Sequence, residues 1–366
     1  MDHNTKNMSL ALFFTVGISL ERWHHLGMID REVTFYNELS KHFQRIYLFT
    51  YGNREDLKFS PYLRENIKII PNERSLNPFL YSILIPFMHR KILKSVDVVK
   101  TNQMMGSWSA VLSRYLNKNV LIVRTGYVLS LFKNDWISRL IERFAYRNAD
   151  GIITSSLRGY DYIEEKYSPK GLHYAIPNYV ETERFRPLNM NKDETSLCFV
   201  GRLTRQKNLF ALIEALKGLP YSLNIIGTGE LKEELEKFAE ENDCNVHFMG
   251  NIANQDLPPV LNKHEIFILP SMYEGMPKTL LEAMSCALPV IGTNVEGIKE
   301  VITPGHDGIL CGIDSDSISK AIVMLMEDDD LRIKLRKNAR HTIIDKYSLK
   351  KVFQNELELI KKISVG

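Results

Sequence analysis

The sequence predicts an α/β protein made of two doubly wound parallel sheets, each covered by helices on both faces. In the first half, short apolar runs alternate with stretches of helical periodicity, and the second half repeats this plan. The strand-like runs of the first half are Ser9–Val16, Ile46–Thr50, Ile67–Ile70, Val96–Lys100, Val120–Val123 and Gly151–Thr154. Those of the second half are Leu197–Val200, Tyr221–Ile226, Val246–Met249, Ile266–Leu269 and Val290–Thr293. Because strands that alternate with helices pair in parallel, each half predicts one open sheet.

A proline in the stretch 176–180, Ile-Pro-Asn-Tyr-Val, separates the two halves and marks a linker or turn. We therefore predict a first domain over residues 1–178, a second over 179–348 and a final helix over 349–366. The helical patterns of the first half are Gly27–Ser40, Ser107–Leu116, Asp135–Asn148 and Ser156–Tyr167. A chain of 366 residues that is 44% hydrophobic can bury two ordinary cores.

The composition argues against a zinc-binding protein and a membrane-spanning protein. The four cysteines are scattered without zinc-like spacing, which favours a reducing compartment, and Cys198 and Cys286 are expected as small buried residues. No apolar run is long enough to span a bilayer, and Leu10–Leu20 fits a first core strand better than a signal-peptide core. Residues 1–180 hold 24 Lys and Arg against 16 Asp and Glu. This basic half suits an anionic partner, such as a membrane surface or a lipid diphosphate, as well as it suits ordinary charge scatter.

The most informative motif is the stretch 274–282, Glu-Gly-Met-Pro-Lys-Thr-Leu-Leu-Glu. It follows a strand-like run and leads into a helical pattern, so we expect Glu274 on the loop before a helix and Glu282 inside that helix. Gly275 lets the backbone approach a ligand closely, and the free N–H groups at a helix start favour an anion. Two carboxylates around such a helix start suit a nucleotide sugar. Taken alone, each carboxylate fits a solvated glutamate equally well.

A second motif lies at the end of another strand-like run, where Gly201 and Arg202 are followed by Lys207 near the next helix start. A strand, a glycine turn, two cations and a helix start would cradle a diphosphate. Arginine offers a planar fork to paired phosphate oxygens, and lysine adds a point charge. The alternative is a solvated basic loop.

These two motifs occur in one order with Gly227-Thr228-Gly229-Glu230 and Pro289-Val290-Ile291. Between about residues 176 and 302 this combination resembles the donor-binding half of a retaining glycosyltransferase of family 4, the glycosyl transferases group 1. The resemblance implies the GT-B fold, with two Rossmann-like domains facing across a cleft and a C-terminal helix that crosses back onto the first domain. Ala287 stands where family members commonly have glycine, and we expect an alanine there to require an ordinary backbone conformation.

The resemblance also implies a role for each matching residue. Arg202 and Lys207 would hold the donor diphosphate and stabilise its charge as it leaves, while Glu274 faces the transferred sugar. These three are the expected catalytic residues. Glu282 would accept hydrogen bonds from the ribose hydroxyls. The other expected donor-binding residues are Gly201, Gly275, Met276, Pro277, Lys278, Thr279, Leu280 and, near the base, Ile252.

Loops that follow strands of the first half are the candidates for acceptor binding, since ligands of open parallel sheets bind at the carboxyl ends of strands. The candidates are Gly17, Arg22, Gln103 and Arg124. Trp23 is expected either to stack on a sugar or to pack in the core. His24 and His25 lack the carboxylate spacing of a metal site, so no metal is expected. The apolar run Phe79–Met88, which precedes a basic stretch, fits either a core helix with a solvated end or a helix lying on an anionic membrane.

Together these inferences predict a cytoplasmic enzyme of the hexosyltransferase type. It would move a sugar from a nucleoside diphosphate donor, UDP or GDP, to an acceptor hydroxyl with retention at the anomeric carbon. Front-face attack is preferred, because Glu274 is better placed for sugar hydroxyls than for the nucleophilic role of a double displacement. No cofactor or metal is expected, because Arg202 and Lys207 would supply preorganised positive charge at the leaving diphosphate.

The expected partners are the nucleotide sugar and a glycan or lipid-linked acceptor in surface polysaccharide, lipopolysaccharide or glycolipid assembly. A peripheral contact with the anionic inner face of the cytoplasmic membrane is a further option, and no nucleic acid is expected. The alternatives are a non-catalytic sugar-nucleotide-binding partner protein and a GT-B sugar epimerase.

Overall fold

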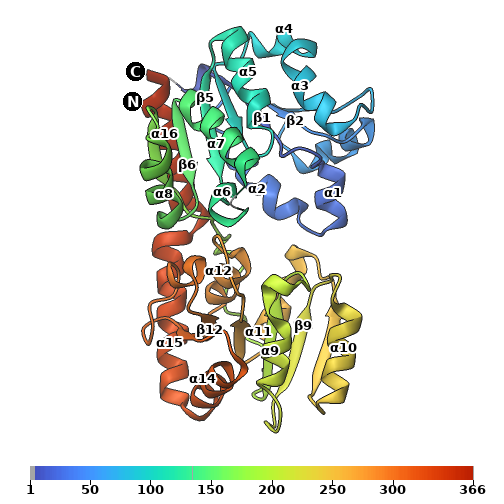
Figure 1. The fold of residues 1–366 in the computed structure, drawn as a ribbon, viewed down its shortest axis with the longest axis vertical. Coiled ribbons are helices and arrows are strands. Elements are labelled where there is room, and N and C mark those ends of the chain that lie inside the picture. Colours follow the sequence, from blue (N-terminus) through green and yellow to red (C-terminus); the bar gives the residue numbers. More distant parts are fainter. Residues whose placement is uncertain (1–4, 134, 366) are drawn as a thin grey trace. The chain divides into compact units, whose positions relative to one another are not determined.

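The computed structural model describes residues 5–133 and 135–365, and the chain divides into two compact units (Figure 1). Unit 1 comprises Met1–Pro177 together with Phe353–Gly366, and unit 2 comprises Asn178–Val352. The division falls at the proline that separates the two apolar patterns. The final helix begins within unit 2 and joins unit 1 from Phe353 onward.

Unit 1 contains a parallel sheet of seven strands in the order β3-β2-β1-β4-β5-β6-β7. The strands are β1 (Ser9–Phe13), β2 (Arg45–Phe49), β3 (Ile67–Ile70), β4 (Val98–Thr101), β5 (Val120–Thr125), β6 (Gly151–Thr154) and β7 (Leu172–Ala175). In this sheet β2 and β3 lie on one side of β1, and β4 to β7 lie on its other side. The carboxyl ends of β1 and β4 therefore flank a topological switch point, where open α/β sheets bind ligands.

The helices of unit 1 form a layer on each face of this sheet (Figure 1). They are α1 (Leu20–His25), α2 (Ile29–Ser40), α3 (Pro78–Met88), α4 (Arg90–Leu93), α5 (Ser107–Asn117), α6 (Leu129–Lys133), α7 (Trp136–Asn148), α8 (Leu157–Tyr167) and α16 (Leu349–Val365). A 3₁₀ segment, η2, covers Arg54–Tyr62. On one face α3 packs against α5, and α5 packs against α7. On the other face α2 and α16 lie together, since the rings of Phe35 and Phe353 are 5.8 Å apart.

The C-terminal helix α16 is part of the core of unit 1. Glu356 is fully buried and accepts a hydrogen bond of 2.8 Å from Arg124 of β5. The Nζ atom of Lys100 on β4, itself 2% exposed, lies 3.0 Å from the other carboxylate oxygen. Ile363 fills the space over Gly151, where a Cβ atom would come within 2.2 Å of the Ile363 Cδ1. The predicted return of the final helix to the first domain is thus confirmed.

Unit 2 contains a parallel sheet of six strands in the order β10-β9-β8-β11-β12-β13. The strands are β8 (Ser196–Val200), β9 (Ser222–Ile226), β10 (Val246–Gly250), β11 (Ile266–Leu269), β12 (Val290–Thr293) and β13 (Ile309–Cys311). Its helices are α9 (Leu209–Glu214), α10 (Lys232–Glu241), α11 (Leu257–Asn262), α12 (Lys278–Ser285), α13 (Glu296–Lys299), α14 (Ser315–Glu327) and α15 (Asp329–Thr342). The shorter helical segments are η3 (Arg205–Lys207), η4 (Asn254–Asp256) and η5 (Ile343–Tyr347). The switch point of this sheet lies between β8 and β11.

The predicted pair of doubly wound α/β sheets is therefore confirmed, and two edge strands that the sequence pattern did not predict complete it. β7 and β13 each lie at the end of a sheet, and their residues are only partly buried or exposed. The predicted burial of Cys198 and Cys286 is confirmed, at 0% and 2% exposure.

The expectation for Ala287 is wrong. Its φ is +55°, in the left-handed region, where a Cβ atom is strained. Ala287 follows the C-cap residue of α12, and its N–H donates to the Met284 carbonyl at 3.0 Å while the Leu288 N–H donates to the Ala283 carbonyl at 3.1 Å. The helix end requires a left-handed residue for these bonds, so the chain accepts an alanine in a conformation that glycine adopts more readily.

Candidate functional site

The loop after β8 carries the first two cations of the site. Gly201 ends the strand and packs backbone to backbone on Gly227, whose φ is +138° and whose added Cβ would lie 1.9 Å from the Gly201 carbonyl oxygen. Arg202 is exposed directly after this turn, and Lys207 ends the 3₁₀ segment η3 with a side chain only 12% exposed. The tight glycine contact thus fixes the start of a loop that presents both cations beside the switch point.

The loop after β11 brings Glu274 to the same place. The Lys207 Nζ forms an ion pair with the Glu274 Oε1, and the Ser271 hydroxyl donates to that oxygen at 2.7 Å. Thr293 of β12 in turn donates to the Ser271 carbonyl at 2.5 Å. Glu274 is 8% exposed. The carboxylate predicted to lie before the helix is therefore held by a lysine and a serine, inside unit 2.

The backbone of this loop is fixed from two sides. A Cβ atom on Gly297 would lie 1.8 Å from the Gly275 carbonyl oxygen, so only glycine allows α13 to approach the loop this closely. The Asn178 side chain donates from Nδ2 to the Met276 carbonyl at 2.8 Å. Asn178 lies 98 residues away in the sequence, and no local pattern marks it as part of the site.

Glu282 lies one turn inside α12 and is 2% exposed. Its Oε1 accepts a hydrogen bond of 2.8 Å from Asn254 at the start of η4, and Asn254 accepts one of 2.7 Å from Arg184. Asn254 belongs to the loop after β10 that also holds Ile252, which is partly buried against the core. The sequence predicts this loop near the base through Ile252. It does not predict Asn254, which orients the Glu282 carboxylate.

The first turn of α12 supplies the last residues of the candidate site. Pro277 is the N-cap residue, and it makes no side-chain cap hydrogen bond to the N–H groups of this helix start. Lys278 and Thr279 are partly exposed there, while Leu280 is fully buried and anchors the turn in the core. Unit 2 therefore brings together an arginine, a lysine–glutamate pair, an uncapped helix start and a buried glutamate at one switch point. Two cationic side chains beside a helix start can contact an anionic ligand, while the two carboxylates can accept hydrogen bonds from its hydroxyl groups.

The four acceptor-side candidates of unit 1 divide into two kinds. Gly17 has φ of +77° with no atom within 4 Å of an added Cβ, and Arg22 is exposed on α1. Gln103 instead accepts a hydrogen bond of 2.8 Å from the Gly126 N–H and so supports the loop after β5. Arg124 is paired with Glu356 of α16. The structure gives these last two side chains a supporting role in the sheet.

Trp23 packs in the core, which decides between its two predicted roles. It is 4% exposed, and its ring centroid lies 4.5 Å from that of Phe14. Its other aromatic neighbour is Tyr36, at 6.3 Å.

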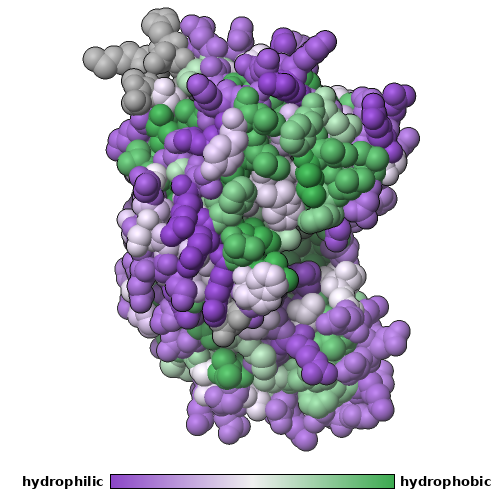
Figure 2. Space-filling model, turned by 45° about the horizontal axis from the view of Figure 1, so that its top comes forward, coloured by the Kyte–Doolittle hydropathy of each residue, from purple (hydrophilic) through white to green (hydrophobic). Residues whose placement is uncertain are grey.

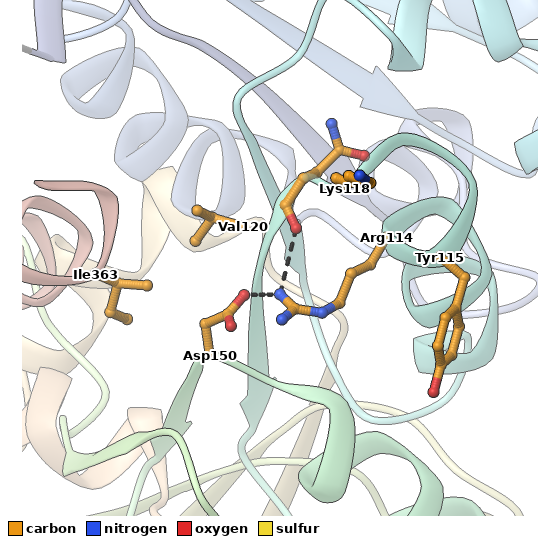
Figure 3. Close-up of a pocket in the computed structure, with 7 residues that line it drawn as sticks. Arg114, Tyr115, Lys118, Val120, Asp150 and Ile363 are labelled. Atoms are coloured by element: carbon orange, nitrogen blue, oxygen red, sulfur yellow. Dashed lines mark hydrogen bonds and ion pairs between the residues drawn. The ribbon is translucent and has the colours of Figure 1, made fainter. Parts of the chain in front are cut away.

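A cavity of about 530 Å³ opens near the amino ends of the unit 1 strands, beside the start of β5 (Figure 3). Arg114 forms an ion pair there with Asp150, and its Nη1 also donates to the Asn119 carbonyl at 3.3 Å. These charges are directed at each other, and the cavity lies away from the carboxyl ends of the strands. We therefore assign the Arg114–Asp150 ion pair of this cavity a structural role in the sheet.

Two further features concern residues 5–133 and 135–365, the part of the chain that the structure describes. These residues contain no group of three or more His, Cys, Asp or Glu side chains placed to hold a metal ion. Within the same ranges, no helix combines the length and the apolar character needed to cross a bilayer.

Comparison with known proteins defines the class of this fold. Residues 180–342 match the family model for glycosyl transferases group 1. An uncharacterized glycosyltransferase of Methanocaldococcus jannaschii is 30% identical over 287 residues, which cover 67% of this chain and 70% of that protein. The Escherichia coli UDP-Gal:alpha-D-GlcNAc-diphosphoundecaprenol alpha-1,3-galactosyltransferase is 32% identical over 210 residues, 52% of this chain and 54% of that protein. The crystal structure of Anabaena HepE in complex with UDP aligns with a TM-score of 0.80 at 17% identity, covering 97% of this chain and 100% of that one.

These similarities, with the two doubly wound sheets, place the molecule among the GT-B glycosyltransferases. The chain belongs to the glycosyl transferases group 1 and is an enzyme of that class. The family resemblance of the two sequence motifs is thereby confirmed.

Proposed function

We propose that this enzyme transfers a sugar from a nucleoside diphosphate sugar to an acceptor hydroxyl with retention of the anomeric configuration. The observation that carries the proposal is the Lys207–Glu274 ion pair, which stands beside the uncapped start of α12 and near Arg202 at the β8/β11 switch point. This arrangement sets two cationic side chains and the N–H groups of a helix start around one switch point, where a diphosphate would lie. The UDP bound to the HepE crystal structure and the UDP-sugar donor in the name of the E. coli relative favour a uridine diphosphate donor, with a guanosine diphosphate donor as the alternative.

In the proposed reaction the bond between the anomeric carbon and the diphosphate oxygen breaks, and the acceptor oxygen bonds to that carbon on the same face. The acceptor proton passes to the departing diphosphate oxygen. Arg202 and Lys207 stabilise the charge that develops on the diphosphate, a form of preorganised electrostatic stabilisation. The backbone N–H groups between Gly275 and Leu280, other than at Pro277, would donate to sugar and phosphate oxygens.

Glu274 has a second role in this proposal. Its Oε1 is taken by Lys207 and Ser271, so the carboxylate is oriented before any ligand arrives. We assign it to hydroxyls of the transferred sugar rather than to covalent attack. Glu282 is assigned to the ribose and Ile252 to the vicinity of the base.

The acceptor is proposed to be a glycan or a lipid-linked sugar. The E. coli relative carries a diphosphoundecaprenol acceptor in its name, which supports a role of this chain in glycolipid or surface polysaccharide assembly at the inner face of a membrane. Gly17 and Arg22 are the acceptor-side residues that the structure leaves open for this role. The proposed reaction uses no cofactor besides the donor.

The proposal is tested by measuring the melting temperature of the purified protein with UDP-, GDP- and ADP-sugars, with and without a chelator. A ligand at 100 times its dissociation constant stabilises the native state by about 2.7 kcal/mol. We expect one nucleotide series to raise the melting temperature and the rise to survive chelation. Turnover of that donor to free nucleoside diphosphate, with retention in the product, completes the test. If none of the donors binds or turns over, the proposal is wrong and a non-catalytic partner role is favoured.

A further inference from the structure

The exposed surface of helix α7 has an unusual composition. The exposed side chains of this helix are all either large and apolar or arginine. The apolar ones are Trp136 (72% exposed), Leu140 (59%), Ile137 (52%) and Phe144 (38%), and the basic ones are Arg139, Arg143 and Arg147. At about 3.6 residues per turn, the apolar residues form one stripe and the arginines form a second stripe directly beside it.

The opposite side of α7 packs into unit 1 by ordinary rules. Ser138, Ala145 and Tyr146 are buried there. The one acidic residue of the helix, Glu142, is also on this side, at 0% exposure, and accepts a hydrogen bond of 2.8 Å from the Tyr167 hydroxyl. The outward face therefore carries positive charge and apolar area without any carboxylate from its own helix.

A second helix of the same layer repeats this combination. Phe79, Phe87, Leu80 and Met88 of α3 are 62%, 54%, 47% and 37% exposed. Three exposed basic residues follow in and after α4, namely Arg90, Lys91 and Lys94, and the chain from Arg74 to Val96 contains no Asp or Glu. The buried residues of α3, such as Tyr81 and Ile85 at 0%, show that its other side belongs to the core. The role predicted for this segment as a core helix is confirmed for its buried side, and the membrane role stays a prediction.

The two surfaces belong to one face of the molecule. α5 lies between α3 and α7 and packs against both, so the outward sides of all three helices point away from the same face of the sheet. Between them α5 exposes Tyr115 at 65%, while its Trp108 donates to Ser82 of α3 at 2.8 Å. Figure 2 shows hydrophobic residues in green gathered on this side of unit 1 among hydrophilic residues in purple. We call the exposed apolar and basic residues of α3, α4 and α7 the docking face.

The chemistry of the docking face selects its occupant. A water-exposed surface of this apolar content is typical of a site of association rather than of a free surface. Tryptophan, leucine and phenylalanine beside a row of arginines are the residues by which helices lie in the interface of an anionic bilayer. Each basic side chain near such a surface adds attraction to acidic headgroups. Lysine, which this face carries at Lys91 and Lys94, is depleted in protein–protein interfaces.

We propose that the docking face binds unit 1 to an anionic lipid bilayer, with the apolar stripe of α7 inserted between headgroups and its arginines paired with lipid phosphates. Where the proposed function holds, this places the enzyme at the membrane that carries a lipid-linked acceptor. Binding to the bilayer itself requires only the docking face, so the two proposals can fail separately.

The test is co-sedimentation of the full chain with vesicles of phosphatidylcholine alone or mixed with phosphatidylglycerol. We expect binding to rise with the phosphatidylglycerol fraction. The double variant L140E/F144E should weaken binding to the mixed vesicles by at least about tenfold, because it removes apolar area and adds two carboxylates to an anionic interface. The double variant R143E/R147E should weaken it similarly and should also remove most of its salt dependence.

Matched controls lie on α15 of unit 2. Ile333 is 61% exposed and Lys334 and Lys337 are exposed, so I333E and K334E/K337E make the same chemical changes outside the docking face. These controls should bind vesicles as the unaltered chain does. The proposal is overturned if the α7 variants bind equally well, or if binding does not depend on the anionic lipid. It is also overturned if the unaltered chain ignores vesicles and instead forms a dimer that L140E/F144E abolishes. Donor binding, measured without vesicles, should be the same in all variants and reports separately on the proposed function.

Discussion

Lys207 and Glu274 stand 67 residues apart in the sequence and form an ion pair in unit 2, with the lysine at 12% and the glutamate at 9% side-chain exposure. The pair joins the loop after β8 to the loop after β11, which are the two loops that flank the switch point. Each partner orients the other in a site partly shielded from water. A cation positioned in this way needs little reorganisation when negative charge develops on a leaving group.

The first prediction is that Lys207→Ala and Arg202→Ala each lower kcat. Loss of one group that stabilises developing charge costs about 10²–10³ in rate, and we expect an effect near the lower end for each cation. Steady-state turnover of the donor identified by melting temperature measures it. Lys237→Ala on α10, an exposed lysine at 76%, serves as the control and should leave kcat unchanged. Normal turnover in both the Lys207 and Arg202 variants would show that the diphosphate does not bind at this site.

The second prediction separates binding from chemistry. Glu282→Ala should weaken donor binding by about tenfold or more, since a hydrogen bond to a charged group contributes about 1.5–3 kcal/mol. Asn254→Ala should weaken it to a smaller extent, because Asn254 orients the Glu282 carboxylate without itself being assigned to the ribose. Calorimetric titration with the nucleoside diphosphate gives the dissociation constant, and kcat at saturating donor should change little. A large fall in kcat with unchanged affinity would show that Glu282 acts in the chemical step.

Residues that lie close together in the sequence predicted much of this site. The β8 and β11 loops each combine a strand, a glycine and charged residues within about ten positions, which is a pattern that local reading can detect. Asn178 and Asn254 could not be found in this way. Each forms hydrogen bonds with residues far along the chain, and a lone asparagine in a loop has no periodic or motif signature.

The two edge strands that the sequence did not predict lack a long continuous apolar run. Buried strands such as β11 are continuous apolar runs, whereas β7 has the sequence Leu-His-Tyr-Ala and β13 is three residues long. Edge strands are packed on one side only, so their sequences need less apolar character. The partner of Arg124 could not be predicted either, because Glu356 lies 232 residues further along the chain, on a helix that also carries the exposed Glu358.

The third prediction concerns Ala287. Its left-handed backbone costs roughly 1–2 kcal/mol relative to an ordinary conformation, and glycine removes that cost while adding some entropy to the unfolded chain. Ala287→Gly should therefore stabilise unit 2 by about 1 kcal/mol. Differential scanning calorimetry measures the shift. As a control, Ala321→Gly within α14, at 5% exposure, should destabilise the same unit. A lower melting temperature for the Ala287 variant would contradict the strain argument.

The fourth prediction uses the buried pair of Lys100 and Glu356. Burial lowers the pKa of the Lys100 ammonium, and the charge of Glu356 opposes that shift. Between the folded pKa and the ordinary lysine pKa of 10.5 the unfolded chain binds more protons at Lys100, so its contribution to stability rises with pH through that window. Glu356→Gln removes the opposing charge, which lowers the folded pKa further and extends the window toward neutral pH.

At pH 7 this variant should be destabilised by about 3–5 kcal/mol, the usual result of leaving one member of a buried ion pair alone. Its deficit should shrink between pH 7 and pH 9, as Lys100 loses its proton in the folded variant. The three tryptophans, Trp23, Trp108 and Trp136, all lie in unit 1, so tryptophan fluorescence during urea unfolding reports on this unit. Glu358→Gln, an exposed glutamate on the same helix at 64%, should show neither the destabilisation nor the change of slope. A deficit for Glu356→Gln that stays constant from pH 7 to pH 9 would mean that Lys100 keeps its proton in the variant and finds another partner.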